Sequence, residues 1–268
     1  MPAPFRIMGI VNVTPDSFSD GGQYLDTQAA VAHARELEAD GAALLDVGGE
    51  STRPGAEPVA LQEELRRVVP VIEALADGGT EAQISIDTVK LRVAEAAVDA
   101  GASYVNDVTA FRHDPELAGF VADSRLDCCL THMRGEPRTM QHDPRYDDVV
   151  SEVKAFLEER MAFAVDAGIA EEQIQLDPGI GFGKTTEHNL ELLRRLDELV
   201  ALGRPVVVGV SRKSFLGALT GRAVDQRLAA TLTANVLAFA RGATVFRVHD
   251  VAPLRDALTV AAATLRAP

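Results

Sequence analysis

Eight short apolar segments lie along this chain, and a polar residue stands at or just beyond the end of each one. The segments are residues 6–12, 43–49, 83–88, 104–109, 128–133, 174–180, 205–211 and 245–251. The polar residues are Asn12, Asp46, Asp87, Asn106, His132, Asp177, Lys213 and Arg247. A buried strand has no packing reason to end in a charge, but a ring of parallel strands whose carboxyl ends meet at an active site does. The pattern therefore predicts eight strands with one functional face.

Segments with helical periodicity separate these runs. Residues 62–75, for example, carry Leu65, Val68, Ile72 and Leu75 at intervals of three and four. Strands that alternate with helices pair in parallel and are joined by right-handed crossovers. For 268 residues and eight such units we expect the α/β fold class, as a closed (β/α)8 TIM barrel forming a single domain over residues 1–268. A doubly wound open sheet is the structural alternative.

Composition limits the partners and the compartment. The formal net charge of −14 disfavours nucleic acid and anionic membranes as partners, because either would need a basic face. No apolar run approaches the roughly 20 residues that span a bilayer, and no charged-then-apolar leader precedes the first strand. The two cysteines, Cys128 and Cys129, are adjacent, lack metal-binding spacing and are expected to be buried thiols. We expect a cytoplasmic protein.

Basic residues gather near the ends of several predicted strands. Arg53 lies in the long loop after the second run, and Lys213 follows the seventh. Arg247 and His249 are two residues apart in the eighth run, so they share one face of that strand. Barrels commonly hold phosphate at the ends of strands seven and eight. In an acidic chain, this cluster predicts an anionic ligand such as a diphosphate, with an ion pair at the barrel rim as the alternative for Arg247.

Three further polar residues belong to the same rim. Asn12 and Thr52 carry neutral oxygen atoms that could bind a phosphate oxygen or Mg²⁺, which prefers oxygen ligands and substrate phosphates. His132 ends the fifth run and either lines the pocket or supports its wall.

Carboxylates and an amide mark the other part of the predicted site. Asp87 ends the third run, Asp177 ends the sixth, and Asn106 lies in the fourth. An inward carboxylate is costly unless it is paired. A ligand with a fork of N–H donors, such as a 2-amino-pyrimidinone ring, would pair it, and Asn offers the same ring a donor and an acceptor. An internal ion pair of Asp177 with Lys213 is the alternative when no ligand is bound.

Several motifs of the chain resemble those of one family, the dihydropteroate synthases of folate biosynthesis, which are the targets of sulfonamides. The matching segments are residues 12–22 (NVTPDSFSDGG), 46–55 (DVGGESTRPG), 85–88 (SIDT), 106–108 (NDV), 132–135 (HMRG), 177–184 (DPGIGFGK), 211–217 (SRKSFLG) and 247–251 (RVHDV). They follow the family's order over almost the whole chain. Residues 109–111 depart from it, because they read Thr-Ala-Phe where the family often has Ser-Gly-Gly.

The resemblance implies a transferase that acts on two small molecules. The enzyme would condense 6-hydroxymethyl-7,8-dihydropterin diphosphate with 4-aminobenzoate, releasing diphosphate and forming 7,8-dihydropteroate, with Mg²⁺ as cofactor. The resemblance also implies a homodimer. Two alternatives remain open at this point: a pterin-dependent methyltransferase, which shares the barrel and the pterin contacts, and a non-catalytic pterin-binding paralogue.

The same resemblance implies roles for individual residues. The pterin would be held by Asp87, Asn106, Asp177 and Lys213, between walls formed by Met133, Phe182 and Gly209. The diphosphate would be held by Asn12, Thr52, Arg53 and His249, with Mg²⁺ near Asn12, while Arg247 would stack on the pterin and reach the diphosphate. Phe18, Pro54 and Ser214 would surround the aminobenzoate, and Asp20 and Asp46 would lie near the reacting carbon.

Overall fold

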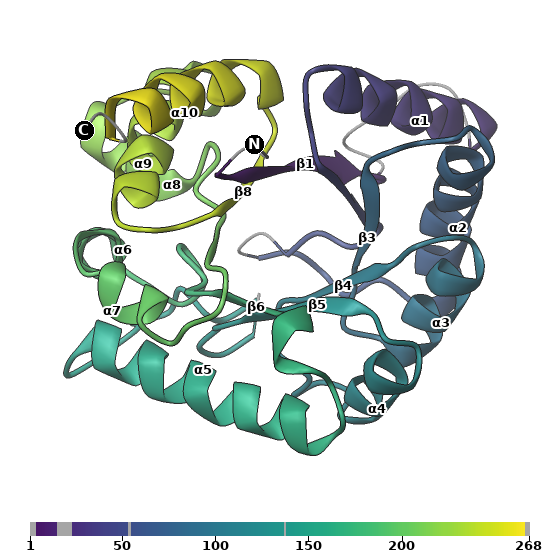
Figure 1. Ribbon diagram of the computed structural model, residues 1–268, viewed down its shortest axis with the longest axis horizontal. Coiled ribbons are helices and arrows are strands. Elements are labelled where there is room, and N and C mark those ends of the chain that lie inside the picture. The colour runs from purple at the N-terminus through teal and green to yellow at the C-terminus, as the bar shows by residue number, and fades with distance from the viewer. Residues whose placement is uncertain (1–3, 15–22, 53–54, 137, 266–268) are drawn as a thin grey trace.

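The computed structural model describes residues 4–14, 23–52, 55–136 and 138–265, which form one sheet of eight parallel strands. The strands are β1 (Arg6–Asn12), β2 (Leu44–Gly48), β3 (Gln83–Asp87), β4 (Tyr104–Asp107), β5 (Asp127–Thr131), β6 (Ile174–Asp177), β7 (Val207–Val208) and β8 (Val245–Val248). They are hydrogen-bonded in the order β6-β5-β4-β3-β2-β1-β8-β7. A parallel bridge between Leu176 and Val206 joins the two ends of this order. The predicted barrel is confirmed (Figure 1), and the open sheet is wrong.

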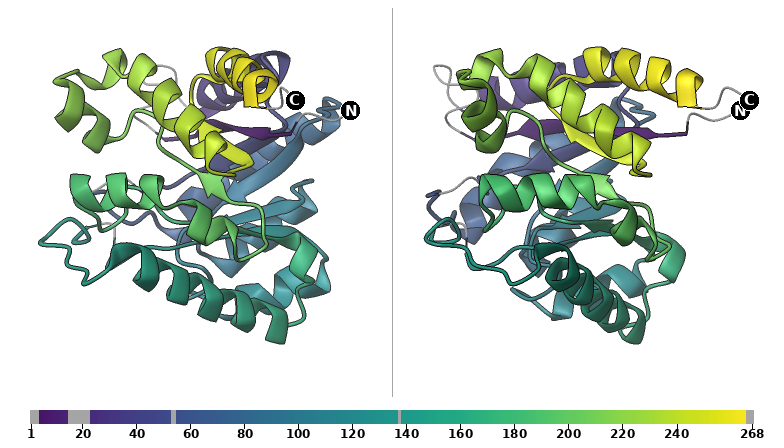
Figure 2. Two further views of the ribbon diagram at one scale, coloured as in Figure 1. Left: turned by 60° about the vertical axis from the view of Figure 1, so that its left-hand side comes forward. Right: turned by 90° about the vertical axis from the view of Figure 1, so that its left-hand side faces the viewer.

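Helices cover the outside of the barrel (Figures 1 and 2). They are α1 (Gln23–Ala39), α2 (Leu61–Asp77), α3 (Leu91–Asp99), α4 (Glu116–Asp123), α5 (Val149–Asp166), α6 (Thr186–Arg194), α7 (Asp197–Val200), α8 (Ser214–Thr220), α9 (Leu228–Ala240) and α10 (Val251–Leu265). Among the described residues, none of these helices has the length and apolar content to cross a membrane.

Local sequence explains how individual helices form and dock. On α2, Val68, Ile72 and Leu75 are fully buried against the sheet, at the spacing of one helix face. At the start of α5, the Asp148 carboxylate accepts hydrogen bonds from the backbone N–H groups of Val150 and Ser151, which would otherwise lack partners. The apolar stripe therefore fixes which side of a helix faces the barrel, and the cap fixes where the helix begins.

Residues that alternate along the strands fill the barrel interior in layers. At the amino ends, Arg6 donates to Gln83 at 2.7 Å and Gln83 donates to Asp127 at 2.9 Å, which forms a polar network across β1, β3 and β5. Above this network lies an apolar layer. It consists of Met8, Leu44, Tyr104, Cys129, Val207 and Val245. Since side chains of a strand alternate in direction, the next inward position on β2, β4 and β8 falls on Asp46, Asn106 and Arg247.

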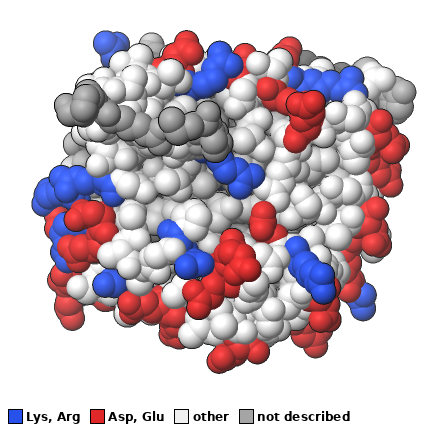
Figure 3. Space-filling view, in the orientation of Figure 1, with Lys and Arg blue, Asp and Glu red and all other residues white. Residues whose placement is uncertain are grey.

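The two ends of the barrel therefore differ. β1 begins and α10 ends at the same end of the barrel (Figure 2). Figure 3, drawn in the orientation of Figure 1, shows that end, where basic and acidic side chains are interspersed around the rim. The polar layer with Asp46, Asn106 and Arg247 lies toward the opposite end, because these residues come after the apolar layer along each strand. The functional site is expected there.

Candidate active site

Arg247 on β8 forms hydrogen bonds to residues of two other strands at the carboxyl end of the barrel. Its Nε donates to the Asp46 Oδ2 at 2.6 Å, and its Nη2 donates to the Asp87 Oδ2 at 2.7 Å. Asp46 is fully buried and Asp87 nearly so, whereas 21% of the Arg247 side chain remains exposed. Because β8, β2 and β3 each supply one of these residues, the contacts cross the barrel interior. The guanidinium is thereby held in a fixed plane.

Asp46 is the hub of this network. Its Oδ1 accepts the Ser85 hydroxyl at 2.5 Å, and its Oδ2 also accepts the Asn106 amide at 3.0 Å. Ser85 was not among the predicted site residues. The signal was present, however, because Ser85 precedes Asp87 by two residues and so shares its face of β3. The structure brings the predicted residues Asp46, Asp87, Asn106 and Arg247 into one hydrogen-bonded group.

Asp177 and Lys213 form the second half of the site. Asp177 ends β6 and accepts the Gly179 N–H at 2.6 Å. Lys213 precedes α8, donates to the Ile180 carbonyl, and has its Nζ 4.5 Å from the centre of the Phe182 ring. The structure shows no ion pair between the described side chains of Asp177 and Lys213, the alternative that the sequence offered, and the two groups interact through their charges. An ammonium over an aromatic face is attracted by the ring quadrupole.

Gly209, just after β7, shows that the two halves share one mouth. A Cβ atom placed on Gly209 would lie 3.9 Å from the Arg247 Cβ, the Asp177 Oδ2 and the Lys213 Nζ. A side chain at this position would therefore fill the space between the carboxylate and the two cations. Glycine leaves that space open for a flat ligand.

The loop after β6 owes its shape to a glycine and a buried lysine. Gly179 has φ +65°, and a Cβ there would lie 1.8 Å from the His132 carbonyl oxygen. Lys184 Nζ donates to the Gly179 and Phe182 carbonyls at 3.0 and 3.1 Å and lies 2.8 Å from the His132 Nδ1. His132 therefore supports the pocket wall through Lys184, which resolves the alternatives that the sequence left open. Nothing in the segment 177–184 indicated that Lys184 would be buried.

Burial changes the ionisation of the groups that line the site. Burial raises the pKa of Asp87 to about 7. The charge of Arg247 lowers this pKa, and the charge of Asp46 raises it further. Burial also raises the pKa of Asp177, and Lys213 is the main charge that opposes this. The pKa of Lys213 falls to about 8 through burial, which Asp177 counteracts. Pairs of groups whose environments perturb their pKa values in this way are typical of functional sites.

His249 and Ser211 form a contact beside the two cations. The Ser211 hydroxyl lies 2.9 Å from the His249 Nδ1 and accepts the His249 backbone N–H at 3.2 Å. If the hydroxyl hydrogen is donated to Nδ1, the ring proton resides on Nε2, the form that can donate to an anion. Arg212 is occupied by Asp250, with two hydrogen bonds of 2.6 and 3.1 Å.

The remaining predicted residues fall into two groups. Asn12 ends β1 and is half-buried, Thr52 is half-buried after β2, Met133 is buried after β5, and Ser214 starts α8 and is exposed. Phe18, Asp20, Arg53 and Pro54 lie outside the described residues, so their predicted roles stay predictions. The structure describes no cluster of three or more His, Cys, Asp or Glu side chains able to hold a metal ion.

The departure at residues 109–111 leaves the site intact. Ala110 and Phe111 adopt left-handed backbone conformations, with φ of +52° and +60°, which glycine takes without steric cost. Asp107 holds this turn, since its carboxylate accepts the N–H groups of Thr109 and Phe111 at 2.6 and 2.8 Å. Phe111 is fully buried in the core, so its packing offsets the backbone cost.

Cys128 and Cys129 are both free and buried, as expected. Cys128 faces the helices and Cys129 faces the barrel interior. Burial raises the pKa of both thiols, which leaves little reactive thiolate.

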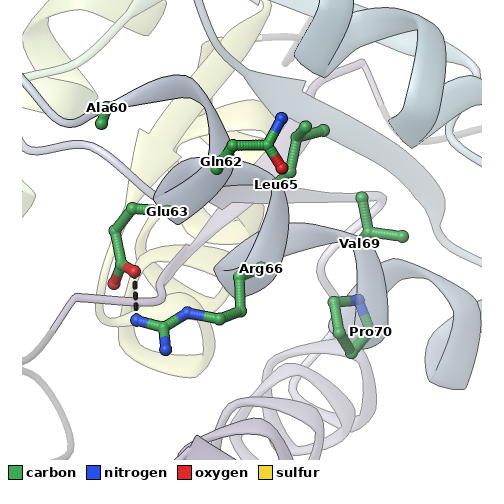
Figure 4. Close-up of a pocket in the computed structure, with 7 residues that line it drawn as sticks. All are labelled: Ala60, Gln62, Glu63, Leu65, Arg66, Val69 and Pro70. Carbon is green, nitrogen blue, oxygen red and sulfur yellow. Dashed lines mark hydrogen bonds and ion pairs between the residues drawn. The ribbon is translucent and has the colours of Figure 1, made fainter.

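A groove of about 700 Å³ lies elsewhere, along α2 (Figure 4). It is lined by Ala60, Gln62, Glu63, Leu65, Arg66, Val69 and Pro70. Its lining contains one ion pair, Glu63 with Arg66, whose side chains are 30% and 55% exposed. No predicted site residue contributes to it. Buried charges converge instead at the carboxyl end of the barrel, which makes that end the candidate active site.

Comparison with known proteins identifies the family of this chain. Residues 8–249 match the family model described as pterin binding enzyme. The dihydropteroate synthase of Escherichia coli strain K12 is 46% identical over 262 residues, which cover 98% of this chain and 92% of that protein. Two solved structures each superpose on this chain with a TM-score of 0.92. Each alignment covers 98% of this chain and 94% of the chain in the solved structure. One is the Xanthomonas albilineans dihydropteroate synthase with 4-aminobenzoic acid (52% identity), and the other is the Yersinia pestis dihydropteroate synthase with a sulfonamide drug complex (44% identity).

Proposed function

This chain belongs to the dihydropteroate synthase family of transferases, and we propose that the polar layer at the carboxyl end of its barrel is the active site. There, 4-aminobenzoate would displace diphosphate from 6-hydroxymethyl-7,8-dihydropterin diphosphate. The relatives do not support the methyltransferase or the non-catalytic paralogue. The observation that carries the proposal is the Arg247 guanidinium, held between Asp46 and Asp87 beside Asp177 and Lys213.

The carboxylates and Asn106 suit the recognition of a pterin ring. A carboxylate accepts two N–H bonds from the 2-amino-pyrimidinone edge, and an Asn amide offers that edge both a donor and an acceptor. Lys213 can donate to a ring carbonyl from its position over Phe182. Arg247 keeps its guanidinium face for stacking, because its two carboxylate partners bind along its edge. A flat ring would fit against Gly209.

The reaction needs stabilisation of the leaving group more than a base. The C–O bond to the diphosphate breaks and its electron pair leaves with the diphosphate, while the amine nitrogen forms a new bond to the CH₂ carbon and then loses a proton. An aryl amine is already neutral at pH 7, so its lone pair is available. The negative charge that grows on the leaving oxygen would be met by Arg247 and His249, with Thr52 and Arg53 as further contacts. Such charges act without reorganisation when they are fixed beforehand.

Mg²⁺ would bind mainly through the diphosphate and water. Asn12 would supply one amide oxygen at the end of β1, and among the described residues no group of three or more His, Cys, Asp or Glu side chains could hold a metal ion. This donor set fits an ion that keeps several waters and binds substrate phosphates. When bound, Mg²⁺ would neutralise charge on the leaving diphosphate.

Removing divalent ions is therefore expected to weaken binding of the pterin diphosphate, while binding of 6-hydroxymethylpterin, which lacks the diphosphate, stays the same. Calorimetric titrations with Mg²⁺ and with EDTA check this. Equal affinities for the diphosphate under both conditions would contradict the role of the ion.

Pterin binding is expected to weaken on acidification through pH 7. Asp87 must be ionised to accept ring N–H groups, and its pKa is about 7. Below that pH the carboxyl group takes up a proton, so the dissociation constant rises, approaching about tenfold per pH unit. Titrations of 6-hydroxymethylpterin between pH 5 and pH 7.5 measure this. Asp87→Asn should bind weakly and without this pH dependence, and a flat profile for the unaltered protein would count against the role of Asp87.

We also propose a cytoplasmic homodimer that sulfonamides inhibit. Two free cysteines suit a reducing compartment. Large apolar side chains are exposed on the neighbouring helices α9 and α10, including Leu237 (58%) and Val260 (67%), and such residues suit a partner surface. A sulfonamide resembles aminobenzoate and would compete for its place.

The direct experiment is an assay with both substrates. Diphosphate and 7,8-dihydropteroate should form in equal amounts, and neither should form when aminobenzoate is omitted. Release of diphosphate without the pteroate product would overturn the proposed reaction.

A further inference from the structure

A second buried charge cluster lies next to the active site. Glu64 on α2 is 1% exposed, and Lys90, which precedes α3, forms an ion pair with it. Thr88, the residue after Asp87, donates its hydroxyl to Glu64 at 2.6 Å. A buried carboxylate is costly unless it is paired, so Lys90 and Thr88 are what keep Glu64 in place. The charge of Glu64 also contributes to the raised pKa of Asp87 in the polar layer described above.

Lys90 also holds the loop after β2, whose described residues are 49–52 and 55–60, at both of its ends. The same ammonium group forms an ion pair with Glu50 at the start of the loop and donates to the Val59 carbonyl at 2.9 Å near its end. On α2, Arg67 donates to the Gly49 carbonyl at 2.7 Å. The loop is therefore fixed at its first residue, its second residue and its last turn before α2.

Thr52 follows Glu50 by two residues, so the direction in which the chain leaves β2 decides where Thr52 is presented. If these ends were free, substrate binding would have to order them and would lose the corresponding conformational entropy. Holding the ends beforehand avoids that loss.

We propose that Glu50, Lys90 and Glu64 form a latch that positions the loop after β2 for the diphosphate. Glu50 and Lys90 are positioning residues here, since they act through the loop. This proposal rests on the proposed function, because it assigns the loop to the diphosphate end of the site.

Glu50 is the informative residue to change. It is 24% exposed and lies on the loop side of the latch, so its removal leaves the buried pair of Lys90 with Glu64 intact. Lys90→Met instead leaves Glu64 with Thr88 alone and is expected to destabilise the fold. Loss of activity in Lys90→Met would therefore not separate positioning from stability.

In Glu50→Ala, the KM for the pterin diphosphate is expected to rise about tenfold. The kcat, the affinity for 6-hydroxymethylpterin and the melting temperature should stay close to those of the unaltered protein. A purely structural role would shift the melting temperature and pterin binding together. In a double variant with Lys90→Met, removing Glu50 should add little to the KM, because both changes break the same contact.

Glu57→Ala is the matched control. It removes the same charge from the same loop, but Glu57 is 72% exposed and pairs with Arg138 at 3.4 Å on the surface. Its KM for the pterin diphosphate should match that of the unaltered protein.

An unchanged KM in Glu50→Ala, or an equal rise in Glu57→Ala, would overturn the latch while the proposed function stands. A fall in melting temperature and in pterin affinity in Glu50→Ala would also overturn it, in favour of a structural role. An unaltered protein that makes no dihydropteroate would overturn the proposed function and the latch with it.

Discussion

Lys213→Ala is expected to lower kcat/KM by about three orders of magnitude while the protein stays folded. The lysine contributes in two ways. It places an ammonium over the Phe182 ring, from where it would donate to the proposed pterin. It is also the main charge that opposes the raised pKa of Asp177. Without Lys213, Asp177 would take up a proton more readily and would accept ring N–H groups less well.

Stability should change little in this variant, because burial already lowers the pKa of Lys213 to about 8 and its ammonium is costly to keep in the folded state. Steady-state kinetics and thermal unfolding measure the two effects separately. Lys154→Ala on α5 is the matched control and should behave as the unaltered protein. A kcat/KM of Lys213→Ala equal to that of the unaltered protein would refute the role of this residue.

Arg247→Ala is expected to abolish turnover and also to destabilise the fold, by about 3–5 kcal/mol. Its removal leaves Asp46 and Asp87 buried without their cation. The pKa of Asp87 is already raised by burial, and Arg247 is the charge that opposes this increase. Without Arg247 the folded state would bind a proton at Asp87 up to a higher pH than the unfolded chain does. The variant should therefore be relatively most stable at low pH and should lose stability as the pH rises.

A second change separates the two effects of Arg247. Arg247→Ala combined with Asp87→Asn should recover part of the stability, because one of the unpaired charges is gone, but no activity. Denaturant unfolding at pH 5 and pH 8 checks the stability, and the two-substrate assay checks the activity. Equal stability of Arg247→Ala at both pH values would contradict the proposed coupling to Asp87.

The strand ends were predictable because a polar residue after a short apolar run has few structural explanations. Their polar character at the strand ends placed Asp87, Asn106 and Asp177 at the carboxyl end of the predicted barrel. The barrel itself was predicted from the alternation of strands with helices. The family resemblance then added residues that form the walls of the predicted pterin pocket, such as Phe182 and Gly209.

Other features depend on contacts that no local pattern encodes. Arg247 is 201 residues from Asp46 and 160 from Asp87, so their pairing could not be read from spacing. β7 has only two residues, shorter than the predicted segment 205–211, because the chain turns into the Lys213 loop. The helices α4 and α7 are also short, with eight and four residues. Such short elements depend on packing against the barrel more than on their own sequence.

We propose that one cluster at the carboxyl end of the barrel binds both the pterin and the diphosphate. The decisive measurement is a crystal structure of the protein with 6-hydroxymethyl-7,8-dihydropterin diphosphate and Mg²⁺. We expect the pterin edge against Asp177 and Asn106, its face on Arg247, and the diphosphate beside His249 and Thr52. A ligand bound elsewhere, or a pterin that leaves Asp177 and Arg247 untouched, would contradict it.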